Sequence, residues 1–253
     1  MPIWTFDLPE NTQPGLVLDL SSLSVVTAPG TGRTITVEAD ELLEPLLDVT
    51  ADGAIVTIRQ IALVGRDRFV GLWPWGPKGS RLRVTVPEGA RLDARIDAGS
   101  INAEHPWDQV QVHASAGSIR LGDCKSAQVH ADAGSIVIGA LHDGSVRARA
   151  GSVRIRSTTG TVSAYTEAGS VKVIEAYEGF LDLSSQLGTV SVGVPQGTAV
   201  LADCRSEFGQ ATTDLPRQDH PEALERITEA DGGAGRCAWP TAPGPPPGRW
   251  RSE

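Results

Sequence analysis

The chain has 253 residues, of which 28 are glycine and 17 are proline, while aromatic residues make up 5% and hydrophobic residues 40%. This length and apolar content suffice for a core without disulfide or metal support. The formal net charge of −9 disfavours nucleic acid as a partner of the whole chain. No apolar run is long enough to span a membrane, and the first residues lack a basic region followed by an apolar stretch. We therefore expect a globular, cytoplasmic protein without a transmembrane segment.

Cysteine usage points to a reducing compartment. The three cysteines, Cys124, Cys204 and Cys237, are an odd number at wide spacing, and none belongs to a CxxC pair. Such spacing fits neither a disulfide framework nor a zinc site. We expect reduced thiols.

Residues 1–86 are predicted to form an N-terminal β region and cap. Alternating segments at 18–23, 34–39, 54–58 and 81–86 predict strands. Between them, the sequence FVGLWPWGP at 69–77 carries Trp73 and Trp75, and its prolines and glycines exclude regular structure. Two interpretations remain open: the loop binds a partner through exposed tryptophans, or it folds back over the solenoid.

Residues 87–213 contain an internal repeat, Ala-Gly-Ser-Ile or a close relative. Its glycines are separated by 18, 17, 17, 18 and 19 residues and are Gly99, Gly117, Gly134, Gly151, Gly169 and Gly188. Apolar residues alternate before each glycine, up to the residue directly preceding it, as in Leu92, Ala94, Ile96 and Ala98, and again after it. This alternation predicts strands with one buried face on both sides of a glycine corner.

Two arrangements satisfy this pattern, a meander of hairpins or a coil in which each unit stacks on the previous one. The constant spacing favours the coil, because stacking would place identical residues about 4.8 Å apart. We therefore predict an all-β fold, a single-stranded β-solenoid (β-helix) with rungs of 17–19 residues. Its last rung covers 200–209, with Cys204 pointing inward, and terminal rungs need caps against edge-to-edge association.

Residues 214–253 lack the repeat and form a separate C-terminal tail. A short helix is predicted over 221–230, followed by an irregular or extended Pro/Gly segment at 243–248. The tail also holds Trp239 and Trp250. It either packs as a cap or remains a flexible, partner-binding segment.

The repeated Ala-Gly-Ser corners, together with VPEGA at 86–90 and VPQGT at 194–198, resemble the bacterial putative-adhesin family of unknown function. The resemblance covers about 16–213. It implies a β-solenoid with a role in surface attachment or envelope-stress modules, and it supplies no catalytic residue.

Outward positions align into columns across the rungs. One column reads Arg95, His113, His130, Arg147, Tyr165 and Ser184, and cations gather near the middle rungs at Arg147, Arg149, Arg154 and Arg156. These cations predict a docking face for an anionic polymer or an acidic partner. The alternative is an ordinary solvated face, since the outward positions of any solenoid are polar.

The same columns hold the candidates for catalytic and metal sites. Asp97, Asp132 and Glu167 fall on alternate rungs, about 9–10 Å apart, which is wide for a glycosidase pair, and we expect no aromatic platform beside them. Of the histidines His105, His113, His130 and His142, the middle two would stack about 5 Å apart, but two imidazoles alone make a weak site.

The sequence therefore predicts no enzyme, no cofactor and no metal, but a binding or scaffolding module with an unknown protein or polymer partner. Two alternatives stay open. One is a solenoid that associates with itself end to end or edge to edge, like bactofilin-type filaments. The other is a carbohydrate-active enzyme.

Overall fold

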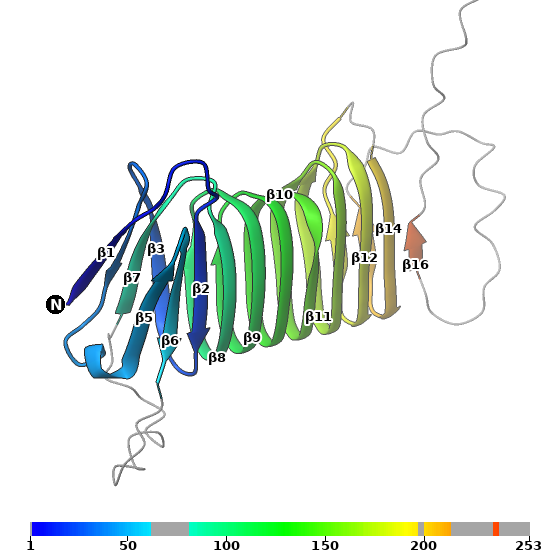
Figure 1. Cartoon of the computed structure of the whole chain (residues 1–253). Coiled ribbons are helices and arrows are strands. Elements are labelled where there is room, and N and C mark those ends of the chain that lie inside the picture. Colours follow the sequence, from blue (N-terminus) through cyan, green and yellow to red (C-terminus); the bar gives the residue numbers. More distant parts are fainter. Residues whose placement is uncertain (1, 62–80, 197–199, 214–234, 238–253) are drawn as a thin grey trace, which may run out of the picture.

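The computed structural model describes residues 2–61, 81–196, 200–213 and 235–237, and its strands stack in one continuous row (Figure 1). A single 3-10 turn, η1 (Glu44–Leu46), is the helical element among these residues. The strands are β1 (Ile3–Asp7), β2 (Gly15–Leu20), β3 (Ser24–Gly30), β4 (Thr34–Glu38), β5 (Leu47–Asp52), β6 (Ile55–Gln60), β7 (Arg81–Pro87), β8 (Arg91–Ala103), β9 (Trp107–Leu121), β10 (Cys124–Thr158), β11 (Thr161–Ala176), β12 (Gly179–Leu187), β13 (Val190–Val192), β14 (Val200–Phe208), β15 (Ala211–Thr213) and β16 (Gly235–Cys237). The predicted all-β solenoid is confirmed.

Successive rungs pair in parallel and in register. β8 pairs with β9, β9 with β10, β10 with β11, and β11 with β12 and β13, so each repeat lies beside the next. Each rung runs along one longer limb, turns at the glycine, and returns along a shorter limb (Figure 1). We call these the first limb and the second limb. Identical side chains therefore form columns on each limb, as the spacing predicted.

At the glycine corner, the backbone of one rung fills the space that a side chain of the next rung would need. A Cβ on Gly151 would lie 1.7 Å from the carbonyl oxygen of Gly134, and the φ angle of Gly151 is +144°. Both conditions exclude any residue with a side chain. The same backbone contact recurs at Gly117, Gly134, Gly169, Gly188 and Gly209.

The core consists of the inward columns of both limbs. Val112, Val129 and Val146 are buried on the first limb, and Ile119 and Ile136 on the second. Cys204 is also buried, as predicted for the last rung. This interior is narrow, which explains why valine, isoleucine and alanine fill it in place of aromatic residues.

One part of the predicted inward pattern is wrong. The residue directly before each corner glycine is exposed, not buried, at Ala98, Ala116, Ala133, Ala150, Ala168 and Leu187. The chain already turns at this position because the following glycine has a positive φ, so strict alternation ends one residue earlier. In the last rungs this exposed column carries larger side chains, Leu187 and Phe208.

The N-terminal strands extend the same two limbs. β2 pairs in parallel with β8, and β3 does so with the second limb of β8, so residues 15–30 form a rung. On the other edge of that rung, β6 pairs in parallel with β2 and β7 with β3. Beyond them, β5 and β4 run antiparallel, and β1 pairs antiparallel with β4. The parallel stack thus changes to antiparallel pairing at this end.

At the C-terminal end the strand pairing also changes from parallel to antiparallel. β16 pairs antiparallel with β14, which places Gly235 opposite Ser206 and Cys237 opposite Cys204. This strand within the tail was not foreseen. The predicted helix at 221–230 and four tryptophans, Trp73, Trp75, Trp239 and Trp250, lie outside the described residues.

A buried histidine closes the core between two rungs. His105 is 4% exposed, and its ring lies 4.3 Å from that of Trp107, which donates its indole N–H to the carbonyl of Ala103. Burial lowers the pKa of His105, against the smaller opposing effects of the Pro106 carbonyl and the Glu88 charge. Within the described part of the chain, His105 Nε2 has no hydrogen-bond partner. His105 is therefore a neutral core residue.

Replacing Gly151 by alanine should strongly destabilise the fold. The new Cβ would lie 1.7 Å from the Gly134 carbonyl oxygen, and we expect a loss of at least about 3 kcal/mol in chemical denaturation. Gly53→Ala is the matched control, because Gly53 also has a positive φ but a Cβ at that position would have nothing within 4 Å. It should cost about 1–2 kcal/mol. Equal losses at both positions would contradict the backbone contact.

His105 should make the protein less stable in mild acid. Its folded pKa lies below the ordinary histidine value of 6.5, so the unfolded chain binds more protons and stability is lost as the pH falls below about 6.5. The loss attributable to this side chain is at most about 1.4 kcal/mol per pH unit. His105→Phe should remove that part of the slope in denaturation curves between neutral and mildly acidic pH. The exposed His142→Phe control should retain it, and an unchanged slope in His105→Phe would refute the assignment.

Candidate ligand-binding face

The first limb carries one outward column in the middle of its face, which we call the central column. The strand register places Arg95 beside His113, His113 beside His130, Arg147 beside Tyr165, Tyr165 beside Ser184, and Ser184 beside Arg205. The corner contact between Gly134 and Gly151 brings His130 and Arg147 into the same register. The column contains no carboxylate from Arg95 to Arg205.

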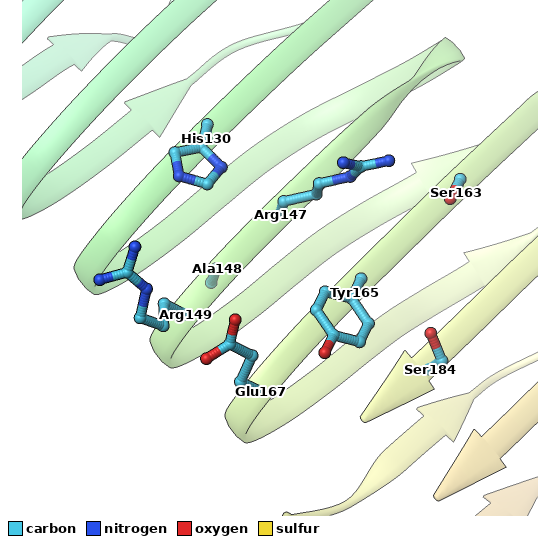
Figure 2. Close-up of a pocket in the computed structure, with 8 residues that line it drawn as sticks. All are labelled: His130, Arg147, Ala148, Arg149, Ser163, Tyr165, Glu167 and Ser184. Atoms are coloured by element: carbon cyan, nitrogen blue, oxygen red, sulfur yellow. The ribbon is translucent and has the colours of Figure 1, made fainter. Parts of the chain in front are cut away.

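A depression of about 450 Å³ lies over the middle of this column. It is lined by His130, Arg147, Ala148, Arg149, Ser163, Tyr165, Glu167 and Ser184. In Figure 2 Tyr165 and Glu167 stand on one rung and Arg147 on the rung beside it, with the guanidinium of Arg147 pointing along its strand towards Ser163. The depression thus combines two guanidinium groups, an imidazole, a phenol ring, a carboxylate and two serine hydroxyls.

Asp132 determines which cations on this face are already paired. Its Oδ1 lies 3.1 Å from Arg149 Nη2 and 3.3 Å from His130 Nε2. Arg147 has no hydrogen-bond or ion-pair partner within the described part of the chain. Arg149 is therefore held by an acidic neighbour, whereas the guanidinium of Arg147 is available to a ligand.

The structure divides the four predicted docking arginines between the two limbs. Arg147 and Arg149 precede the corner at Gly151 and line the depression. Arg154 and Arg156 follow the corner and are exposed on the second limb, where Arg154 lies beside Lys172. The sequence columns already placed Arg154 and Arg156 beyond the predicted corner, and the structure adds that the two pairs lie on different limbs.

The four histidines singled out from the sequence lie in different surroundings. His113 and His130 stack with ring centroids 4.9 Å apart, as expected, while His105 is in the core and His142 is exposed in the part of β10 that leads into the next rung. No group of three or more His, Cys, Asp or Glu side chains suited to a metal ion occurs among the residues that the structure describes. Stacked parallel imidazoles do not by themselves surround an ion.

The three candidate carboxylates occupy unlike surroundings. Asp132 is paired with Arg149, and Glu167 lines the depression while Asp97 does not. The expectation that no aromatic ring accompanies them is wrong for Glu167, since Tyr165 lines the same depression. The two residues are separated by one position on the first limb, so the sequence did contain this signal.

Cys124 does not provide a nucleophile. Burial raises the pKa of its thiol to about 12, with a further contribution from the negative charge of Asp123. The thiol therefore stays protonated near neutral pH, and only a thiolate reacts readily.

The described residues also contain no helix with the length and hydrophobicity needed to cross a bilayer.

Comparison with solved structures finds crystal structures of low sequence identity that align over most of this chain. A protein described as a "putative lipid binding protein" from Parabacteroides distasonis ATCC 8503 is 13% identical, covering 84% of this chain and 91% of that chain, with a TM-score of 0.51. A "putative adhesin" from the same strain is 13% identical over 84% of this chain and 96% of that one, with a TM-score of 0.42. A third, a "putative adhesin" from Bacteroides fragilis NCTC 9343, is 13% identical over 84% and 95%, with a TM-score of 0.38.

The first of these likenesses concerns the fold alone, and no curated protein matches this chain. The family resemblance expected from the glycine corners is nevertheless confirmed. The profile of the Toastrack DUF4097 family matches residues 15–236, most of the chain, so this protein belongs to that family.

Proposed function

We propose that the protein is a non-catalytic binding module, a rigid β-solenoid that holds an anionic ligand over the central column of its first limb. The observation that carries the proposal is Arg147, an exposed guanidinium without a carboxylate partner among the described residues, at the border of the depression. A free guanidinium offers a fork of N–H donors that matches the two oxygens of a carboxylate or phosphate.

The rigid scaffold favours a binding site over a catalytic site that depends on mobile segments. Every side chain of the central column stands on a strand that is paired on both edges, from β8 to β14. Such a face is organised before the ligand arrives, and little conformational entropy is lost on binding. A site on rigid strands therefore favours recognition of an extended partner.

The local chemistry also supports a non-catalytic role. Asp132 is engaged by Arg149 and His130, and the thiol of Cys124 is protonated near neutral pH because its pKa is raised to about 12. A glycosidase would need two carboxyl groups facing one bond, whereas the depression is bordered by Glu167 alone among carboxylates.

Both ends of the parallel stack favour a discrete particle over a filament. β4 and β5 at one end, and β16 at the other, pair in antiparallel orientation and do not continue the parallel ladder. Antiparallel strands at the ends interrupt the parallel ladder, so a second copy could not continue the stack by the same in-register pairing. The sedimentation coefficient should accordingly stay constant as the protein concentration rises.

Two double variants with the same charge change test the binding face. Arg147→Ser with Arg149→Ser removes the first-limb pair, and Arg154→Ser with Arg156→Ser removes the second-limb pair. The probes are alginate oligomers, polyphosphate and phosphatidylglycerol vesicles, the last chosen because a protein of similar fold is described as lipid binding. At least one probe should bind, and the first-limb variant should lower its affinity about tenfold or more in calorimetric titrations.

The second-limb variant is expected to stay within about twofold of the parent protein. The proposal fails if none of the three probes binds. It also fails if both double variants weaken binding equally, since that would reflect net charge and not a particular face.

A further inference from the structure

We propose that the depression between His130, Arg147, Tyr165 and Glu167 binds one acidic sugar unit of a glycan. The carboxylate of the sugar contacts Arg147, its ring lies against Tyr165, and its hydroxyls donate to Glu167. This inference rests on the proposed binding function and names the ligand class for the same face.

The balance of charge around the depression selects a singly charged ligand with hydroxyl groups. Arg149 also lines the depression but is paired with Asp132 at 3.1 Å, so the unpaired charges on the lining are the positive charge of Arg147 and the negative charge of Glu167. A phosphate group with two charges would meet the repulsion of Glu167 and only one free guanidinium. A sugar carboxylate uses Arg147, and the hydroxyls of the same sugar satisfy Glu167 as an acceptor.

The remaining lining residues fit a sugar ring. Tyr165 supplies an aromatic side chain on the rung next to Arg147, so a carboxylate bound to the guanidinium brings its ring over the phenol. Ser163 and Ser184 border the same space and add hydroxyls that can donate or accept (Figure 2). The phenol ring of Tyr165 provides apolar contact area, while hydrogen bonds to the two serines and Glu167 orient the sugar.

The dimensions agree with a small part of a polymer. The depression measures about 450 Å³, within the range of pockets of about 300–1,000 Å³ that hold small ligands. It lies on an exposed face and not in a closed cavity, because it is bordered mainly by outward side chains, which come from four adjacent rungs. A glycan can therefore enter sideways, with its neighbouring units lying along the column.

The test compares an alginate oligomer with the same oligomer after reduction of its carboxyl groups. Calorimetry of the full chain should show affinity for the acidic oligomer and a loss of about tenfold or more for the reduced one. Arg147→Gln should cause a similar loss, with Arg154→Gln on the second limb as the matched control. Tyr165→Phe should preserve affinity within about threefold, and Tyr165→Ser should lower it about tenfold.

The variant Glu167→Gln distinguishes a site that binds a sugar through its hydroxyls from a site that binds an anion alone. It should weaken alginate binding several-fold, because a carboxylate accepts hydroxyl donors more strongly than an amide does. If it strengthens alginate binding, the site is an anion site and the inference is overturned. The inference is overturned equally if the reduced oligomer binds as well as the acidic one.

Failure of the inference can be told apart from failure of the proposed function. Binding of polyphosphate or phosphatidylglycerol vesicles that depends on Arg147, without binding of alginate, refutes the sugar and leaves the binding module standing. Alginate binding that is indifferent to Arg147→Gln refutes both, as does the absence of binding to all three probes. Thermal unfolding of each variant should match the parent, since all of these side chains are at least partly exposed.

Discussion

The close approach of glycine backbones at the corner is the constraint on which the rest of the structure depends. Each carbonyl oxygen occupies the space that a Cβ on the next glycine would need, as between Gly134 and Gly151. Neighbouring rungs can therefore meet in one register only, because a shift by one residue would place a side chain in this space. The contact fixes the alignment of columns from Gly99 to Gly209, and in the rung 15–30 the carbonyl of Leu23 takes the same place beside Gly99.

Aligned columns decide where charge accumulates. On the first limb, Arg147 lies one rung from Tyr165, and Arg149 meets Asp132 across the rung boundary. On the second limb, Arg154 stands beside Lys172. A net charge of −9 for the whole chain therefore coexists with two local cationic regions, and the first-limb region adjoins an aromatic ring and a depression.

The parts of the fold that repeat locally could be predicted, and those that depend on long-range order could not. Spacing identified the corners, and alternation identified the buried column that ends in Cys204. The exposed Ala98 was missed because regular alternation was extended into a residue where the chain already turns. The position of the rung 15–30 could not be predicted. It lies between β8 on one edge and β6 and β7 on the other, and these partners are distant in sequence, so no periodic signal marks the pairing. At the site, the column was foreseen, but the pairing that leaves Arg147 free needed three-dimensional distances.

Distances along the central column test the stacked register most directly. In a background with all three cysteines replaced by alanine, one spin label is placed at Arg95 and a second at Tyr165, Ser184 or Arg205, and electron double resonance measures each separation. In-register rungs predict mean separations of about 19, 24 and 29 Å, an increase of about 4.8 Å per rung. Separations that fail to increase from one rung to the next would contradict the stack and, with it, the binding face.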